Sequence, residues 1–327
     1  MPYINVDEAY ILDNTGLQVD QTVDLPFADA GLTESQQAQA RKNIVAGGTN
    51  PNLLDNLFFT INQRGFTSAT ATTSTVYCVD RWTLFAGGAG AGTLTKNADG
   101  TLTINNSSGT TNMYMRQPLL DLGLTGKTVT ISAMTSDGTV YHATGVVPAQ
   151  NTSYQVVAVA TITSTCEVGF TVAPTTLSYP NLVQISSNAG ANVTLKAVKL
   201  ELGTVSTLAN DTPPNYADEL AKCKYYFNRV YSGAVMGSGW ATSATNAIIL
   251  LPVPQMRATP TLSVTSVSTF RMKGAGGVSV VPSAVTINSA SQVGVCINVT
   301  ISGATTHDLY CLSGTDATAY IDLSADL

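Results

Sequence analysis

The stretch that decides the fold spans residues 199–231 and reads KLELGTVSTLANDTPPNYADELAKCKYYFNRVY. Its first residues end a strand that we expect over 193–202. Apolar residues alternate along this strand in one parity up to Ala197 and in the other parity from Val198 onward, and such a switch predicts a β-bulge. Gly203 ends the strand, so an extended crossing follows.

The second half of the stretch predicts a short helix. Pro213 and Pro214 hold the chain out of a helical conformation until Asn215, which is a good N-cap. Acidic residues follow in the first turn and lysines in the last, as the helix dipole favours. We therefore expect one helix, roughly Tyr216–Cys223, and an aromatic strand that begins at Tyr225.

Before this stretch, residues 50–203 show only β patterns. Two hairpins are predicted, one around Asn97–Gly100 and one through Asp137–Gly138. About eight strands, with turn signals between them and no intervening helix, predict a β-sandwich or jelly roll. The glycine-rich run 87–92 lacks the Lys-Ser/Thr and the helix of a phosphate-binding loop, so we interpret it as an ordinary loop.

After the linker of residues 204–224, the segment 225–327 again shows β patterns and predicts a C-terminal β-sandwich. The predicted strands cover residues 225–231, 247–251, 261–267, 278–287, 293–301 and 318–323. Glycine and serine are frequent here, and aromatic residues are few after Phe270. We therefore expect neighbouring chains around a threefold axis to complete its core.

Residues 1–49 contain one predicted helix, over 33–45, with Thr33 as its cap. Its apolar stripe is thin and made of small residues, which is typical of a narrow bundle of identical chains. The residues before the helix have no clear period. Two interpretations remain open for them: a segment that docks onto a larger particle, or a strand packed on its own domain.

Composition restricts the possible functions. The chain has 327 residues, of which 44% are hydrophobic and only 11% charged, a profile of β-sandwich and fibre proteins rather than of disorder. The low share of charge suggests that part of the surface is hidden in an oligomer. A net charge of -6 argues against nucleic acid as a partner, because phosphate binding requires a basic patch. No apolar run is long enough to span a membrane, and Met1 opens no signal peptide, so we expect no membrane insertion.

The residues that carry chemistry are sparse. The two histidines, His142 and His307, lie in different predicted domains, and neither is near a nucleophile elbow or an HExxH spacing. Five widely spaced cysteines without any CxxC are interpreted as small buried hydrophobes rather than disulfides or metal ligands. Carboxylates for glycan hydrolysis are available, but the sequence singles none out. We therefore predict no catalytic residue, no metal and no cofactor.

Four stretches together resemble tail-fibre and receptor-binding proteins of tailed bacteriophages. Residues 199–231 match with a KLE-x-G-T strand and a P-x-x-YA-x-EL-x-x-C-x-x-YF segment. The other matches are LTESQQAQARKNI at 32–44, NLLDN, INQRG and VDRW within 52–82, and PVPQMRATPTL at 252–262. The resemblance implies a virion protein made in the bacterial host cytoplasm and assembled as a homotrimer. It also implies attachment to other tail, baseplate or head proteins through residues 1–49, followed by a jelly-roll domain.

Four side chains are candidates for contacting a ligand, since aromatic faces beside polar groups bind sugars. Trp240 lies in a polar, glycine-rich surrounding that we interpret as flexible, so burial explains it less easily. Tyr114 and Arg116 alternate on a predicted strand and therefore share a face. Trp82 lies in a strand-like run, where core packing and a ligand platform are both open.

These observations predict a phage fibre protein that attaches the virion to the host cell surface. The binding would be non-catalytic and multivalent, to a surface glycan or protein. The alternative is a purely structural fibre or a capsid-decorating protein without a specific receptor. A glycan-degrading enzyme is the third possibility.

Overall fold

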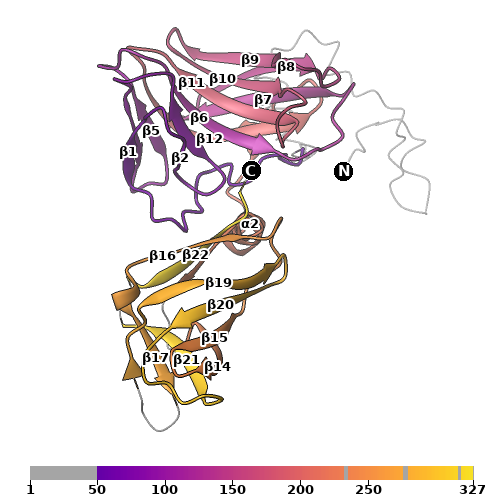
Figure 1. Cartoon of the computed structure of the whole chain (residues 1–327). Coiled ribbons are helices and arrows are strands. Elements are labelled where there is room, and N and C mark those ends of the chain that lie inside the picture. The colour runs from indigo at the N-terminus through magenta and orange to yellow at the C-terminus, as the bar shows by residue number, and fades with distance from the viewer. Residues whose placement is uncertain (1–49, 232–234, 275–278, 316–317, 327) are drawn as a thin grey trace, which may run out of the picture. The chain divides into compact units, whose positions relative to one another are not determined.

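A computed structural model describes residues 50–231, 235–274, 279–315 and 318–326. The chain divides into two compact units, residues 1–49 and 50–327. The helix expected over 33–45, and the attachment segment 1–49 that contains it, lie outside the described residues. The described part is mainly β, as the sequence predicts, and contains one α-helix, α2 (Tyr216–Lys224) (Figure 1).

The first sandwich consists of two six-stranded antiparallel sheets. The β12 sheet has the strand order β1 (Ser68–Thr70), β4 (Thr93–Lys96), β5 (Leu102–Asn105), β12 (Asn192–Leu202), β7 (Thr128–Thr135) and β8 (Val140–Val146). The β6 sheet has the order β2 (Val76–Tyr77), β3 (Thr83–Ala86), β6 (Met113–Leu119), β11 (Asn181–Ser187), β10 (Cys166–Val172) and β9 (Gln155–Thr163). Side chains from both sheets form one buried core, in which Trp82, Phe59 and Phe170 are the largest fully buried aromatic residues.

The C-terminal sandwich pairs a three-stranded sheet with a seven-stranded one. The three-stranded sheet has the order β13 (Phe227–Tyr231), β22 (Tyr320–Ser324) and β16 (Thr261–Val264). The seven-stranded sheet has the order β18 (Ser279–Val280), β17 (Phe270–Gly274), β21 (Leu309–Gly314), β14 (Gly237–Ser243), β15 (Asn246–Leu251), β20 (Gly294–Thr300) and β19 (Ala284–Ser291). A core that includes Phe270, Ile297 and Ile321 is buried within one chain. The C-terminal part therefore has a core of its own, and the contribution expected from neighbouring chains around a threefold axis stays a prediction.

The stretch 199–231 folds largely as its sequence predicts. The pairing of β12 with β7 shifts register between Leu195 and Ala197, which confirms the β-bulge. Asn215 caps α2 by accepting a hydrogen bond from the backbone N–H of Ala217 at 2.8 Å. The aromatic strand begins at Phe227 rather than at Tyr225. Because the N–H of Tyr225 bonds to the Lys222 carbonyl, the chain is still turning out of the helix at that point.

Several other strand predictions are confirmed, and some are corrected. The two expected hairpins are β4–β5 and β7–β8, and residues 87–92 form a loop. The predicted strand 278–287 is two strands, β18 and β19, with Pro282 between them because proline cannot donate a ladder hydrogen bond. The strands β1, β2, β14, β17 and β21 are not predicted.

The linker covers the outer face of the β12 sheet beside β7. Lys199, on β12, is fully buried there, and its Nζ lies 2.7 Å from Asp211 and 3.5 Å from the equally buried Glu201. Thr207 donates hydrogen bonds to Glu201 from both its N–H and its hydroxyl. An ion cluster therefore fixes the segment 203–211 against the sheet.

Residues 54–82 contact the segment formed by α2 and β13. The backbone N–H of Asn56 bonds to the carboxylate of Glu219, and Gln63 Nε2 donates to the Phe227 carbonyl at 2.8 Å. The Arg64 guanidinium lies 3.5 Å from the centroid of the Phe227 ring. The motifs NLLDN, INQRG and VDRW therefore serve to join the first sandwich to the start of the C-terminal part.

Candidate functional site

The outer face of the β6 sheet brings the predicted pair Tyr114 and Arg116 together with residues from other strands. On β6, Met113 and Met115 point into the core, so Tyr114 and Arg116 point outward and are half-buried. Across the sheet, Phe85 of β3 lies opposite Tyr114. On the other side, Gln184 of β11 lies opposite Arg116.

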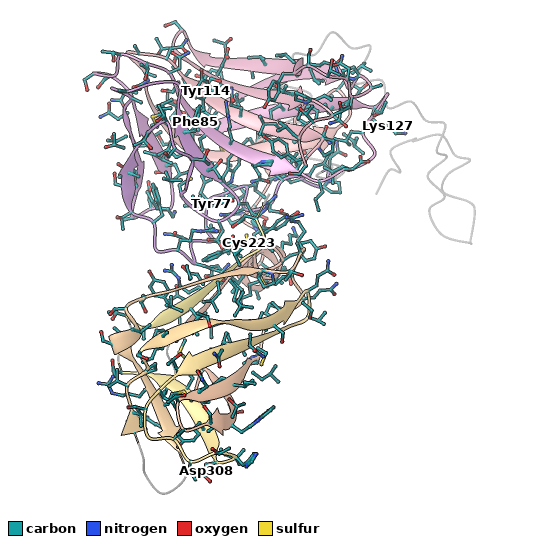
Figure 2. The ribbon with its side chains drawn as sticks, viewed as in Figure 1. Tyr77, Phe85, Tyr114, Lys127, Cys223 and Asp308 are labelled. Carbon is teal, nitrogen blue, oxygen red and sulfur yellow. The ribbon has the colours of Figure 1, made fainter. Side chains whose placement is uncertain are left out.

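These side chains form a compact surface, which we call the platform and define as Phe85, Tyr114, Arg116 and Gln184. The rings of Phe85 and Tyr114 are stacked, with centroids 6.0 Å apart and planes 24° from parallel (Figure 2). The Arg116 guanidinium carbon lies 5.1 Å from the Phe85 centroid and 4.9 Å from that of Tyr114. Arg116 Nε donates to Gln184 Oε1 at 2.6 Å, which fixes the orientation of the guanidinium.

Two tyrosines from loops extend the platform. Tyr179 precedes β11, and Tyr154, which precedes β9, is 55% exposed. Burial raises the pKa of the Tyr179 phenol, and the neighbouring Tyr154 raises it further, whereas Arg116 lowers it. Tyr154 and Arg116 are therefore among the groups that act electrostatically on Tyr179. The arrangement offers flat apolar faces beside hydrogen-bonding groups, which is what a sugar ring requires.

Trp82 does not contribute a binding surface. Its side chain is fully buried, packs edge-to-face against Phe59 at 5.7 Å, and directs its indole N–H at the Asn56 carbonyl. Of the two interpretations that the sequence leaves open, the structure places Trp82 in the core. The interpretation of Trp82 as a ligand platform is therefore wrong.

Trp240 lies on β14, in a regular strand and not in a flexible segment. It is 48% exposed, and its cross-strand neighbours are Leu309 on β21 and Ile248 on β15. Leu309 and Leu250 are 71% and 59% exposed on the same outer face. We call Trp240, Leu309, Ile248 and Leu250 the apolar face. Trp240 and the pair Tyr114 and Arg116 therefore belong to different sheets and do not form one site.

The described residues contain no group of three or more His, Cys, Asp or Glu side chains arranged to hold a metal ion. His142 lies on β8, whereas His307 lies in the loop before β21 with a φ of 72°. A cavity of about 80 Å³ lies among the loops next to Asp121, Gln150 and Asn181. In the same described part, no helix is long and apolar enough to cross a membrane.

Sequence reasoning finds Tyr114 and Arg116 but misses Phe85 and Gln184. The sequence shows only that inward-facing and outward-facing residues alternate within one strand. It does not show which strands become neighbours in the sheet. No family model, curated protein or solved structure matches this chain.

Proposed function

We propose that this chain is a fibre protein of a tailed bacteriophage, located in the virion, that attaches the particle to a surface glycan of the host. The observation that supports the proposal is the platform. It combines two stacked aromatic rings with a guanidinium held by a side-chain amide. The family resemblance of the sequence motifs supports the setting, a homotrimer joined to other virion proteins through residues 1–49.

Attachment by such a protein is non-catalytic and multivalent. The apolar face of a sugar ring packs on Tyr114 and Phe85, and its hydroxyl groups bond to Arg116 and Gln184. One such contact is weak, because the surface is open and the ligand loses translational freedom. Three copies on one fibre raise the effective concentration and hence the avidity.

A purely structural fibre is the second candidate, and the apolar face favours it. Large exposed apolar side chains gathered on one sheet are typical of protein–protein contacts. The same face also fits the contact between copies within a trimer, so the two candidates differ in whether the platform binds a receptor.

Competition for adsorption tests the proposal. Host cells are saturated with the purified protein, the phage is added, and unadsorbed particles are counted. We expect the wild-type protein to block adsorption and Tyr114→Ala to block it much less. Tyr216→Ala is the matched control, because Tyr216 is 58% exposed and lies on α2, away from the β6 sheet. Equal adsorption with and without folded wild-type protein would overturn the proposal and favour the structural fibre.

A further inference from the structure

Arg116 differs from the other arginines in the described part of the chain. Arg64, Arg81 and Arg229 pair with Asp326, Asp55 and Asp322, and Arg257 and Arg271 donate to backbone carbonyls. Arg116 forms no ion pair with any described residue, and its one hydrogen bond there comes from Nε. Its two terminal nitrogens therefore have no acceptor among the residues that the structure describes.

The surroundings of Arg116 keep its guanidinium ready for an external acceptor. Gln184 holds Nε, and Gln184 in turn donates to Ser186 at 2.7 Å, so the amide is itself fixed. The guanidinium carbon lies at about equal distances from the rings of Phe85 and Tyr114. A guanidinium fixed in this way loses little freedom when it binds, and its planar fork matches a carboxylate with two parallel hydrogen bonds.

We infer that the platform binds a sugar that carries a carboxylate, with the carboxylate on the terminal nitrogens of Arg116 and the sugar ring on Tyr114 and Phe85. The inference rests on the proposed glycan-binding function and specifies its ligand class. Uronic acids and ulosonic acids such as sialic acid share this chemistry.

Glu167 restricts where the carboxylate lies. It is exposed on the outer face of β10, opposite Ser186, which is itself opposite Tyr114. Neighbouring strands are about 4.8 Å apart, so Glu167 lies about 10 Å from the Tyr114 position. Its negative charge repels an acidic sugar, and the ligand therefore lies over β3 and β6 rather than over β10.

The experiment measures binding of four probes by calorimetry. The probes are a galacturonic acid oligomer, the same oligomer with its carboxyls reduced to alcohols, sialyllactose and lactose. The variants are Arg116→Gln, Arg116→Lys, Tyr114→Ala, Glu167→Gln and Lys196→Gln. Lys196 is the control for net charge, because it is exposed on β12 in the other sheet and its replacement removes the same single charge.

We expect wild-type protein to bind one acidic probe about tenfold or more tightly than its neutral counterpart, since hydrogen bonds to charged groups are strong. Which acidic probe binds identifies the source of the carboxylate. Arg116→Gln removes the preference, Arg116→Lys keeps part of it, and Lys196→Gln leaves it unchanged. Glu167→Gln tightens the binding of the acidic probe only.

Other outcomes separate this inference from the proposed function. Equal binding of acidic and neutral probes, weakened alike by Tyr114→Ala, would overturn the carboxylate inference and leave glycan attachment in place. A preference that survives Arg116→Gln would overturn it as well. If no probe binds and the protein still blocks phage adsorption, the ligand class is wrong; if adsorption is also unaffected, both proposals fail. Thermal unfolding of each variant verifies that it is folded.

Discussion

Asp80 is a carboxylate that the fold removes almost completely from water, at 1% exposure. Burial raises its pKa above the ordinary 3.8, and hydrogen bonds from Gln63 and the charge of Arg64 oppose this rise. The folded protein therefore binds the proton more readily than the unfolded chain. It follows that the contribution of Asp80 to stability falls as the pH rises from 3.8 through the folded pKa, and is constant above it.

The Asp80→Asn variant tests the direction of this pH dependence of stability. The free energy of unfolding of both proteins is measured by urea denaturation at a series of pH values from mildly acidic to neutral. We expect the stability of the wild type relative to the variant to fall as the pH rises above 3.8 and then to level off. A relative stability that grows over this range would show that the folded pKa is lowered, which is the opposite of what burial predicts.

Lys199 gives a second residue-scale prediction. Removing this buried ammonium group leaves the carboxylates of Glu201 and Asp211 without their cation, so we expect Lys199→Ala to lower the free energy of unfolding by about 3–5 kcal/mol. Lys196→Ala on the same strand removes an exposed lysine and should change it by less than about 0.5 kcal/mol. Similar effects of the two substitutions in urea denaturation would contradict the ion cluster.

The sequence predicts the strand that holds Lys199 but not the burial of this residue. Alternation along β12 identifies Val193 and Leu195 as core residues, and the structure buries both. After the bulge the parity switches to Val198 and Leu200, so the alternation places Lys199 and Glu201 on the polar outer face. They are buried because the linker returns across that face, and the linker sequence alone does not specify where it packs.

At the scale of elements, the contact between residues 54–82 and β13 depends on Arg64. Its guanidinium contacts the rings of Tyr77 and Phe227, at 4.3 and 3.5 Å from their centroids, and pairs with Asp326. Arg64→Ala leaves the nearly buried carboxylate of Asp326 unpaired and removes both ring contacts. We therefore expect the free energy of unfolding to fall by about 2–4 kcal/mol. Arg271→Ala is the control, because Arg271 caps carbonyls near the surface. Equal losses in thermal unfolding would contradict a special role for Arg64.

One of the strands that the sequence fails to predict, β14, is missed for a physical reason. In β14, Gly237 and Gly239 resemble turn residues in the sequence. In the structure, a Cβ at Gly239 would lie 1.8 Å from the Ile248 carbonyl oxygen, so the glycine allows two strands to approach closely. Glycines in a sequence are compatible with a turn and also with two strands that approach closely. Only the arrangement of strands in the sheet shows which of the two applies to Gly237 and Gly239. The platform is missed in part for a related reason, because Phe85 and Gln184 join Tyr114 and Arg116 only through strand order.

For the whole molecule, the apolar face is the surface on which we place the contact between copies in the proposed trimer. Its cross-strand rows run from Leu309 through Trp240 and Ile248, and from Lys273 through Leu250 to Ser289. Lys273, at one end of a row, is their only charged residue. Bringing identical faces together therefore meets little repulsion between like charges and removes several large apolar side chains from water.

Thiol labelling of the native protein tests this placement. Cys296 and Cys311 are half-buried in the same rows, whereas Cys78, Cys166 and Cys223 are buried in the fold. Burial raises the pKa of Cys78 and of Cys166 to about 12 and also raises that of Cys223, so these three should remain unreactive in every folded form.

The trimer and the monomer should then differ at two cysteines only. We expect iodoacetamide to spare Cys296 and Cys311 in wild-type protein that light scattering reports as a trimer. Both should react in a Trp240→Ser variant, which we expect to be monomeric, whereas Tyr216→Ser should behave as wild type because its exposed tyrosine lies on α2. Rapid labelling of both cysteines in a wild-type trimer would move the contact to another surface, and a wild-type monomer would remove the trimer from the proposal.

The platform lies on a different sheet from Trp240, so the Trp240→Ser variant should keep the wild-type affinity for a single soluble glycan. The variant should block phage adsorption less well than the wild type only because a monomer has lost the avidity of three linked sites.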